Sequence, residues 1–278
     1  MIHIRRMTAA DIPLGMRLKE QAGWNQTEAD WRKFLDLEPD GCFFAEFDDE
    51  PVGTTTTCVF GGIGWIAMVL VDARVRGRGI GSALMRHALG YLDEQGVSTV
   101  RLDATPLGQP VYEKLGFVAD YPLVRYKGDL PERGPSEEVV PVRPEDLDRI
   151  CEFDQTVTST DRGKLLTRLF QEGAERFRMV RNGSQCLGFL VMRLGAVARQ
   201  MGPCIASPLV APRLFEDACH RYRNQHVYVD IPTGNAPATA LAESLGLKAQ
   251  RRLLRMHRGQ AIAERIPVLW ASSGPEMG

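Results

Sequence analysis

The chain has 278 residues and a formal net charge of −1, with 44% hydrophobic and 25% charged residues. This balance is typical of a globular protein with room for one large domain or two ordinary ones, and without a global basic field it predicts no nucleic-acid partner. The sequence has neither the apolar block of a signal peptide nor a run of membrane-spanning length. We therefore expect a cytoplasmic protein that binds no membrane.

The six cysteines stand singly, with no C-x-x-C pair and no cysteine–histidine cluster of metal-binding spacing. We expect reduced thiols and no bound metal.

The first half predicts a mixed sheet with helices. Thr8–Asp11 and Thr27–Asp30 follow the pattern of a capping box, with Asp in place of the usual Glu, and each predicts a helix start. The expected strands are 2–7, 42–47, 51–60, 64–71, 98–104 and 117–127, and the expected helices begin near residues 8, 27, 80 and 109. The order is strand, two helices, three strands, helix, strand, helix, strand, which indicates the α/β class with a mixed (α+β) sheet.

Residues 129–138 are polar and rich in Gly and Pro, which predicts a linker between a domain at 1–128 and another at 139–278. The second domain repeats the order of the first. A strand-to-helix opening at 142–147 is followed by a hairpin over 177–182 and 186–197, a strand at 227–232 and a helix at 236–245. The chain therefore carries an internal duplication of architecture.

The segment Val69–Met85 reads as an apolar strand that runs through an arginine- and glycine-rich turn into a helix. A helix start presents unpaired N–H groups and a partial positive charge, so a turn without Cβ atoms lets a pyrophosphate approach closely. The turn carries three glycines and two arginines, followed by a hydroxyl: Arg76, Gly77, Arg78, Gly79, Ile80, Gly81 and Ser82. The pattern predicts a phosphate cradle.

Two other nucleotide motifs fit this turn less well. A Walker loop needs Gly-Lys-Ser/Thr, and here Gly81-Ser82 lacks the lysine. The dinucleotide fingerprint needs Gly-x-Gly-x-x-Gly, and its third glycine falls on Ser82 or Leu84.

Val71-x-Ala73-x-x-Arg76-Gly77-Arg78-Gly79-Ile80-Gly81 closely resembles the acetyl-CoA signature of the Gcn5-related N-acetyltransferases (GNAT), with Ala73 where that family often has proline. A second element, Gln109–Phe117, looks like the family's tyrosine helix and the Gly-Phe that follows it. The resemblance implies acetyl-CoA as co-substrate, held by main-chain groups of Val69, Leu70 and Val71 and by the turn from Arg76 to Ser82. It also implies that Tyr112 is the general acid.

The resemblance places the turn that carries Trp24 and Asn25 over the thioester, so these two residues are candidates for the acceptor site.

No general base stands out. Five carboxylates remain open for that role, namely Glu46, Asp72, Asp103, Asp154 and Asp230, and a water relay is the family's other solution. We expect His220, His226 and His257 to be surface or packing residues, and Arg251, Arg252, Arg255 and Arg258 to form a solvated face, with an acidic-substrate rim as the alternative.

In the second half the cradle is replaced by a segment with Pro208 and Pro212 and without the arginine–glycine turn. This half looks like a degenerate GNAT-like domain that shapes the acceptor pocket. The expected activity is transfer of acetyl from acetyl-CoA to a primary amine of a small molecule, by a monomer or homodimer. A protein or peptide N-acetyltransferase and a non-catalytic acyl-CoA sensor are the alternatives.

Overall fold

The computed structural model describes all of residues 1–278, which divide into two compact units. Unit 1 comprises 1–120, 256–261 and Met277, and unit 2 comprises 121–255, 262–276 and Gly278. No helix is both long enough and apolar enough to cross a membrane.

Unit 1 contains a sheet in the order β1-β2-β3-β4-β5, with the end of β12 beside β5. β1 to β4 pair antiparallel, and β4 and β5 pair parallel. The strands are β1 (Ile2–Arg6), β2 (Cys42–Phe47), β3 (Glu50–Phe60), β4 (Ile63–Val71) and β5 (Thr99–Ala104). The mixed polarity confirms the predicted fold class.

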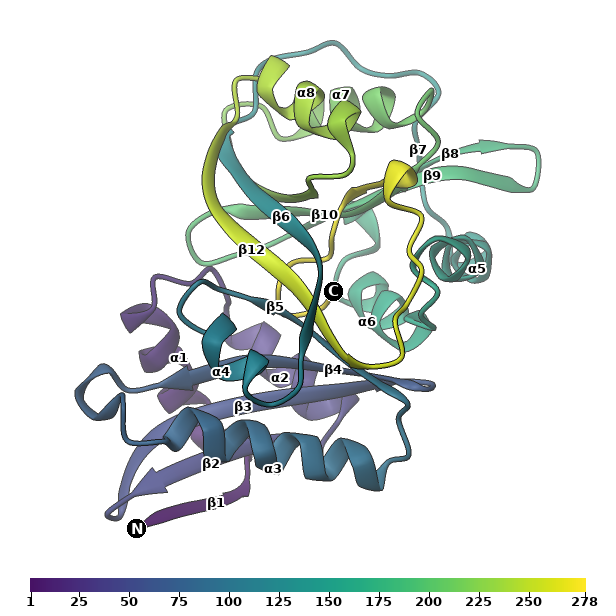
Figure 1. The fold of residues 1–278 in the computed structure, drawn as a ribbon. Helices are drawn as coiled ribbons and strands as arrows, with labels where there is room; N and C mark the ends of the chain where they lie inside the picture. The colour runs from purple at the N-terminus through teal and green to yellow at the C-terminus, as the bar shows by residue number, and fades with distance from the viewer. The chain divides into compact units, whose positions relative to one another are not determined.

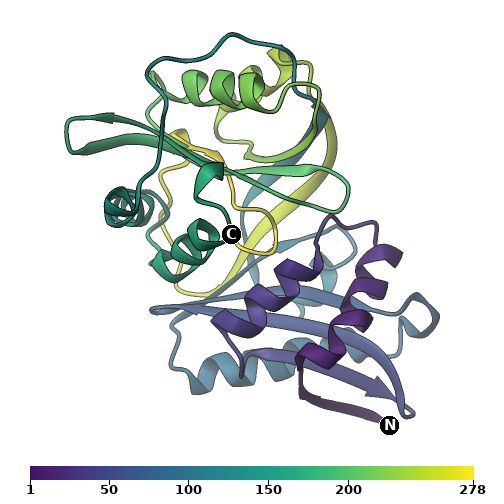
Figure 2. The same cartoon turned by 180° about the vertical axis from the view of Figure 1, so that it is seen from behind.

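Helices cover both faces of this sheet. α3 (Ile80–Glu94) packs on β3 and β4 from one face, while α1 (Ile12–Gln21) and α2 (Glu28–Leu37) pack from the other, as the two opposite views show (Figures 1 and 2). The short α4 (Gln109–Glu113) leads into β6 (Val118–Asp129).

The two predicted capping boxes are present. The N–H of Thr8 donates to Asp11 at 2.8 Å, and the N–H of Thr27 donates to Asp30 at 2.8 Å. The first box opens a short 3-10 turn (Ala9–Asp11) before α1, and the second opens α2 directly. Each carboxylate satisfies an N–H that no intrahelical acceptor can reach.

Unit 2 repeats this arrangement. Its sheet has the order β12-β6-β11-β10-β9-β8-β7, with β13 paired to β10. Its strands are β7 (Val140–Pro141), β8 (Phe177–Asn182), β9 (Gln185–Arg193), β10 (Arg199–Ala206), β11 (His226–Pro232), β12 (Lys248–Gly259) and β13 (Leu269–Ala271). Its helices are α5 (Leu147–Thr158), α6 (Gly163–Glu172), α7 (Ala211–Arg221) and α8 (Ala236–Ser244).

Two strands contribute residues to both units. β6 begins in unit 1 and continues into unit 2, while β12 begins in unit 2 and contributes its last residues, 256–259, to unit 1. The hydroxyl of Thr99 donates to the carbonyl of Gln260 at 2.9 Å, which fixes the end of β12 beside β5. Each unit is therefore completed by a segment that lies far away in the sequence.

A charged pair is buried in the sheet of unit 2. Arg125 on β6 donates twice to Asp230 on the neighbouring β11, at 2.8 and 2.6 Å, and Gln200 on β10 donates to the same carboxylate at 2.9 Å. Burial opposes the charge of Asp230, but the Arg125 guanidinium and Gln200 outweigh it and hold the pKa of this carboxyl below its usual range.

The arginines of β12 are not a uniformly solvated face. Arg255 is 1% exposed and lies 3.4 Å from Glu264, and burial together with Arg125 lowers the pKa of Arg251 to about 10. Arg252 is exposed, as predicted. The solvated-face interpretation is therefore wrong for Arg255, because this buried guanidinium has a carboxylate partner.

We expect Asp230→Asn to lower the free energy of unfolding by about 3–5 kcal/mol at pH 7, because it leaves Arg125 buried without the carboxylate to which it donates. Since the pKa of Asp230 is lowered in the folded state, the advantage of the wild type is present above about pH 4 and fades below it. Urea unfolding between pH 3 and 7 measures both effects. Asp129→Asn, which removes an exposed carboxylate beside His226, is the control. An equal loss in both variants would contradict the prediction.

Candidate active site

The two parallel strands of unit 1 separate early. β4 and β5 are paired at Ile63–Thr99, Gly64–Val100 and Trp65–Arg101 only, although β4 continues to Val71 and β5 to Ala104. On its other side β4 remains paired with β3 as far as Val71. The later half of β4 therefore has a main-chain edge toward β5 that no strand occupies.

A bulge lies at the start of this edge. The register between β3 and β4 shifts between Thr54 and Thr56, and Met68 has φ of 50°, a conformation that costs a non-glycine residue free energy. The hydroxyl of Thr54 donates to the carbonyl of Met68 at 3.0 Å and holds the bulge. The main chain of Val69, Leu70 and Val71 follows it along the edge.

The turn after β4 adopts backbone conformations that require glycine. Gly77 and Gly79 have φ of 79° and 81°, and no atom lies within 4 Å of where either Cβ would be. Both glycines are exposed. The turn is therefore open to a ligand, and its shape comes from the backbone rather than from packing.

Donors converge at the start of α3. Gly79 is the N-cap and has no side chain to accept a hydrogen bond, and the first helical bond runs from the N–H of Ala83 to the carbonyl of Gly79. The N–H groups of Ile80, Gly81 and Ser82 consequently have no acceptor within the helix. They form the positive end of a 15-residue helix.

The two arginines of the turn are anchored on one side. Nε of Arg76 donates to the carbonyl of Val71 at 3.1 Å, and the guanidinium of Arg78 lies 5.3 Å from the ring centroid of Phe47. Both side chains are exposed, so their other N–H groups remain available. The arrangement gives the mouth of the turn two positive charges.

Asp72 fixes the strand end to the turn. It accepts from the N–H of Arg74 at 3.0 Å and from its guanidinium at 3.1 and 3.0 Å, and it also accepts from Arg17 of α1. These donors hold the pKa of Asp72 well below its usual range. Asp72 is fully buried. It is a structural cap and is poorly suited to accept a proton from a substrate.

Tyr112 on α4 lies against Gly108. A Cβ at Gly108 would be 2.8 Å from the ring of Tyr112 and 3.0 Å from its hydroxyl, and the Phe117 ring centroid is 6.1 Å away. Burial raises the pKa of Tyr112 to about 12, so the phenol stays protonated at neutral pH. The absent side chain at Gly108 thus leaves room for the tyrosine.

Trp24 and Asn25 lie in the turn between α1 and α2, as predicted. Trp24 is half-buried, and its main-chain N–H donates to the carbonyl of Lys19, while Asn25 is buried. Their role toward an acceptor remains a prediction.

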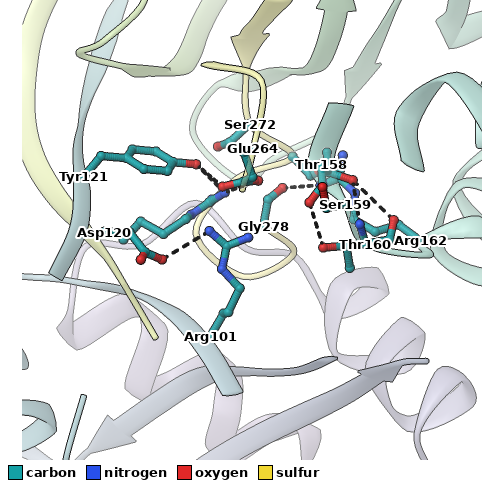
Figure 3. A network of polar contacts seen from close by, with 12 residues as sticks. Arg101, Asp120, Tyr121, Thr158, Ser159, Thr160, Arg162, Glu264, Ser272 and Gly278 are labelled. Atoms are coloured by element: carbon teal, nitrogen blue, oxygen red, sulfur yellow. Dashed lines mark hydrogen bonds and ion pairs between the residues drawn. The ribbon is translucent and has the colours of Figure 1, made fainter. Parts of the chain in front are cut away.

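Two of the five carboxylates left open as bases lie in unit 2, each paired with a buried arginine. Asp230 binds Arg125, and Asp154 accepts from Arg162 at 3.0 and 2.6 Å. The guanidinium of Arg162, on the loop before α6, also donates to the Gly278 carbonyl at 2.5 Å (Figure 3). A carboxylate that neutralises a buried guanidinium gives up that pairing on protonation, which makes it a poor base.

The structure also pairs residues that sequence reasoning did not connect. Nδ1 of His257, near the end of β12, lies 2.5 Å from Oδ1 of Asp120, and Arg101 of β5 donates to Oδ2 of Asp120 at 3.3 Å. Figure 3 shows Arg101 directed at Asp120. No local signal marks this cluster, because its members are separated by up to 156 positions in the chain.

In unit 2 the corresponding gap, between the parallel strands β10 and β11, is filled. β10 and β11 pair parallel at Arg199–Val227 and Gln200–Tyr228 only, and β13 then pairs with β10 at Cys204 and Ile205. The N–H of Ser272, just after β13, donates to the carbonyl of Asp230 on β11. β13 therefore fills the gap between β10 and β11, so unit 2 has no counterpart of the free β4 edge.

The chain matches two family models, "Acetyltransferase (GNAT) family" over residues 14–117 and "Acetyltransferase (GNAT) domain" over residues 150–271. It therefore belongs to the GNAT acetyltransferases and is a tandem member, an enzyme that transfers an acyl group from acyl-CoA to nitrogen.

Three similar proteins illustrate the range of its relatives. Holothin acyltransferase of Pseudoalteromonas sp. is 24% identical over 85% of this chain and 81% of its own length. N-alpha-acetyltransferase MAK3 of Arabidopsis thaliana is 35% identical over 34% of this chain and 54% of its own. An acetyltransferase-like protein of Pyrococcus horikoshii superposes with a TM-score of 0.83 at 26% identity, covering 100% of this chain and 96% of its own.

We expect Asp72→Asn to loosen the start of the turn, because an amide has one acceptor oxygen and no negative charge and so cannot hold both Arg17 and Arg74. The free energy of unfolding should fall by about 1 kcal/mol, as for the loss of a helix cap. Amide hydrogen exchange over 73–79 should become faster than in the wild type.

Asp40→Asn, which removes an exposed carboxylate paired with Arg6, serves as the comparison. Unchanged exchange over 73–79 in Asp72→Asn would show that the turn does not depend on this carboxylate.

Proposed function

We propose that unit 1 binds acetyl-CoA and transfers its acetyl group to a primary amine of a small molecule. The observation that carries this proposal is the free β4 edge, which leads directly into a turn and helix start with open N–H donors. One molecule that has amide groups along an arm and a pyrophosphate at its end fits both features.

In this proposal the pantetheine arm and the pyrophosphate of acetyl-CoA are held by different kinds of interaction. Amides of a pantetheine arm pair with the main chain of Val69, Leu70 and Val71 as an added strand does, whatever side chains are present. The pyrophosphate lies at the N–H groups of Ile80, Gly81 and Ser82, with Gly77 and Gly79 clearing its approach. Arg76 and Arg78 add charge-assisted bonds to its oxygens.

The thiolate that leaves when the thioester is cleaved needs a proton. Tyr112 is our candidate for the general acid, because its phenol is protonated at neutral pH and its hydroxyl makes no hydrogen bond to another protein group. A phenol without an internal acceptor can donate outward without first breaking a bond. The hydroxyl then recovers its proton from the nitrogen that has been acylated, by way of water.

The acceptor is a small molecule rather than a protein in our proposal. The relative named for acylation of holothin matches most of this chain, across both GNAT domains, whereas the protein N-alpha-acetyltransferase matches only a segment of 104 residues. A second domain retained in full supports an acceptor site that is narrower than an open peptide groove. A panel of primary alkylamines, arylamines and short peptides tests this choice, and faster turnover of the peptides would favour the protein alternative.

We expect Gly79→Glu to weaken acetyl-CoA binding by at least about 100-fold, or about 2.7 kcal/mol. The new side chain requires an unfavourable φ and places a negative charge beside the phosphates. Isothermal titration calorimetry with acetyl-CoA, and with ATP and NAD as comparison ligands, gives the dissociation constants.

Gly90→Glu is the matched control, because it adds the same charge to α3 at an exposed glycine with nothing within 4 Å of its Cβ position. Its affinity should stay within about twofold of the wild type. Unchanged affinity for acetyl-CoA in Gly79→Glu would contradict the proposal that this turn binds the pyrophosphate.

We expect Tyr112→Phe to lower kcat by about 10²–10³-fold and to leave acetyl-CoA affinity unchanged, since only the transferable proton is lost. Gly108→Ala should also lower kcat, because its Cβ displaces the tyrosine, while Gly90→Ala should not. Steady-state rates with the best amine of the panel provide the measurement.

Full activity in Tyr112→Phe would exclude the tyrosine as the acid. Acetyl-CoA binding without turnover of any amine by the wild type would instead favour a non-catalytic acyl-CoA sensor.

A further inference from the structure

Asp120 and His257 form a buried pair inside unit 1. His257 is 8% exposed and the side chain of Asp120 is 11% exposed, with Nδ1 and Oδ1 2.5 Å apart. No protein group forms a hydrogen bond with Nε2 of His257. This matches the arrangement in which a carboxylate holds Nδ1–H and leaves the lone pair of Nε2 free to accept a proton.

The pair lies where β4 and β5 separate. Asp120 contacts His257 through Oδ1 and Arg101 through Oδ2. Its carboxylate therefore bridges the imidazole and the guanidinium. Arg101 forms the last β4–β5 pair, with Trp65. His257, on β12, therefore lies one strand beyond β5 from the gap whose free β4 edge is the proposed seat of the acyl donor.

The side of the sheet can be assigned from the strand register. A Cβ on Gly64 would be 2.8 Å from Leu92 of α3, so Gly64 and its partner Val100 face α3. Because side chains alternate along a strand, Arg101 faces the other side, where α1 and α2 pack. The Asp120–His257 pair thus lies away from the face that α3 covers.

We propose that His257 is the general base of the acetyl transfer and that Asp120 is its positioning residue. This inference rests on the proposed function of unit 1. His257 comes from the strand that enters unit 1 from the second half of the chain.

The proton balance is closed. Nε2 takes one proton from the acceptor ammonium, and the freed lone pair forms the N–C bond at the thioester carbonyl. As the C–S bond breaks, its electron pair goes to sulfur, which takes a proton from Tyr112. The second proton on nitrogen returns through water to the tyrosine, and the imidazolium releases its proton to solvent. The products are the amide, the CoA thiol and one proton.

The charged neighbours of the ring favour this role. Asp120 holds Nδ1 of the ring through one carboxylate oxygen, and Arg101 donates to the other oxygen of the same carboxylate. The next arginine along the strand, Arg258, is directed at Asp93 of α3 at 3.5 Å and does not contact the ring.

The decisive variant is His257→Asn. The asparagine amide can replace Nδ1–H toward Asp120, so the buried bond is retained while Nε2 is removed. With the primary alkylamine that the wild type turns over fastest, kcat should fall by about 100-fold or more, and the dissociation constant for acetyl-CoA should stay within about twofold. The deficit should shrink as the pH approaches the pKa of the amine, where the acceptor deprotonates without help, and added imidazole should restore part of the rate.

His226→Asn is the matched control, because His226 also places Nδ1 2.8 Å from a carboxylate, Asp129, but its side chain is 39% exposed and it lies in unit 2. It should behave as the wild type. Asp120→Asn should also lower kcat, and imidazole should not restore it, since the native ring still occupies the position.

Three results would overturn the proposal. His257→Asn could retain kcat within threefold of the wild type, or its deficit could be the same at every pH and insensitive to imidazole, which would indicate a structural residue. If the wild type itself acetylated no amine, the proposed function would fail first, and this inference with it.

Discussion

The early separation of β4 and β5 is the constraint on which the site depends. A buried main-chain N–H or carbonyl is costly without a partner, so two strands that part inside a domain leave an edge that something must satisfy. In unit 1 a bulge at Met68 precedes the free part of this edge, and Asp72 fixes the end of the edge to the glycine turn. In unit 2 the same gap between β10 and β11 is filled by β13. The same gap is therefore filled by the chain itself in unit 2 and left without a strand in unit 1.

What could be predicted from the sequence follows from the range of the interactions. The glycine turn, the capping boxes at Thr8 and Thr27, and strand β2 are encoded within a few neighbouring residues, and they occur where the pattern predicts them. The role of Asp72 was left open, because a carboxylate after a strand can cap, pair or catalyse, and only the approach of Arg17 from α1 decides among these. The conformation of the turn and the helix starts were thus predictable, whereas the surroundings of the carboxylates were not.

The contribution of β12 to both units was beyond the reach of local patterns. Its arginines alternate in part like those of a solvated strand, yet Arg255 is buried beside Glu264, and His257 lies beside Asp120, 137 positions away in the chain. Burial of a charge or an imidazole is stable only with a partner, and no rule of spacing tells where that partner comes from. The alternation of polar and apolar residues therefore mispredicts burial on β12, the strand that contributes its last residues to unit 1.

The acid and the base that we propose differ in their surroundings, and that difference separates their roles. Tyr112 lies against a glycine and an aromatic ring, where burial opposes the phenolate and keeps the proton on oxygen. His257 has the carboxylate of Asp120 beside its Nδ1. An apolar environment around one group and an anion beside the other point the two proton transfers in opposite directions. The stretch from Tyr112 to Asp120 supplies the acid and the residue that positions the base. A single helix-to-strand connection therefore carries both residues.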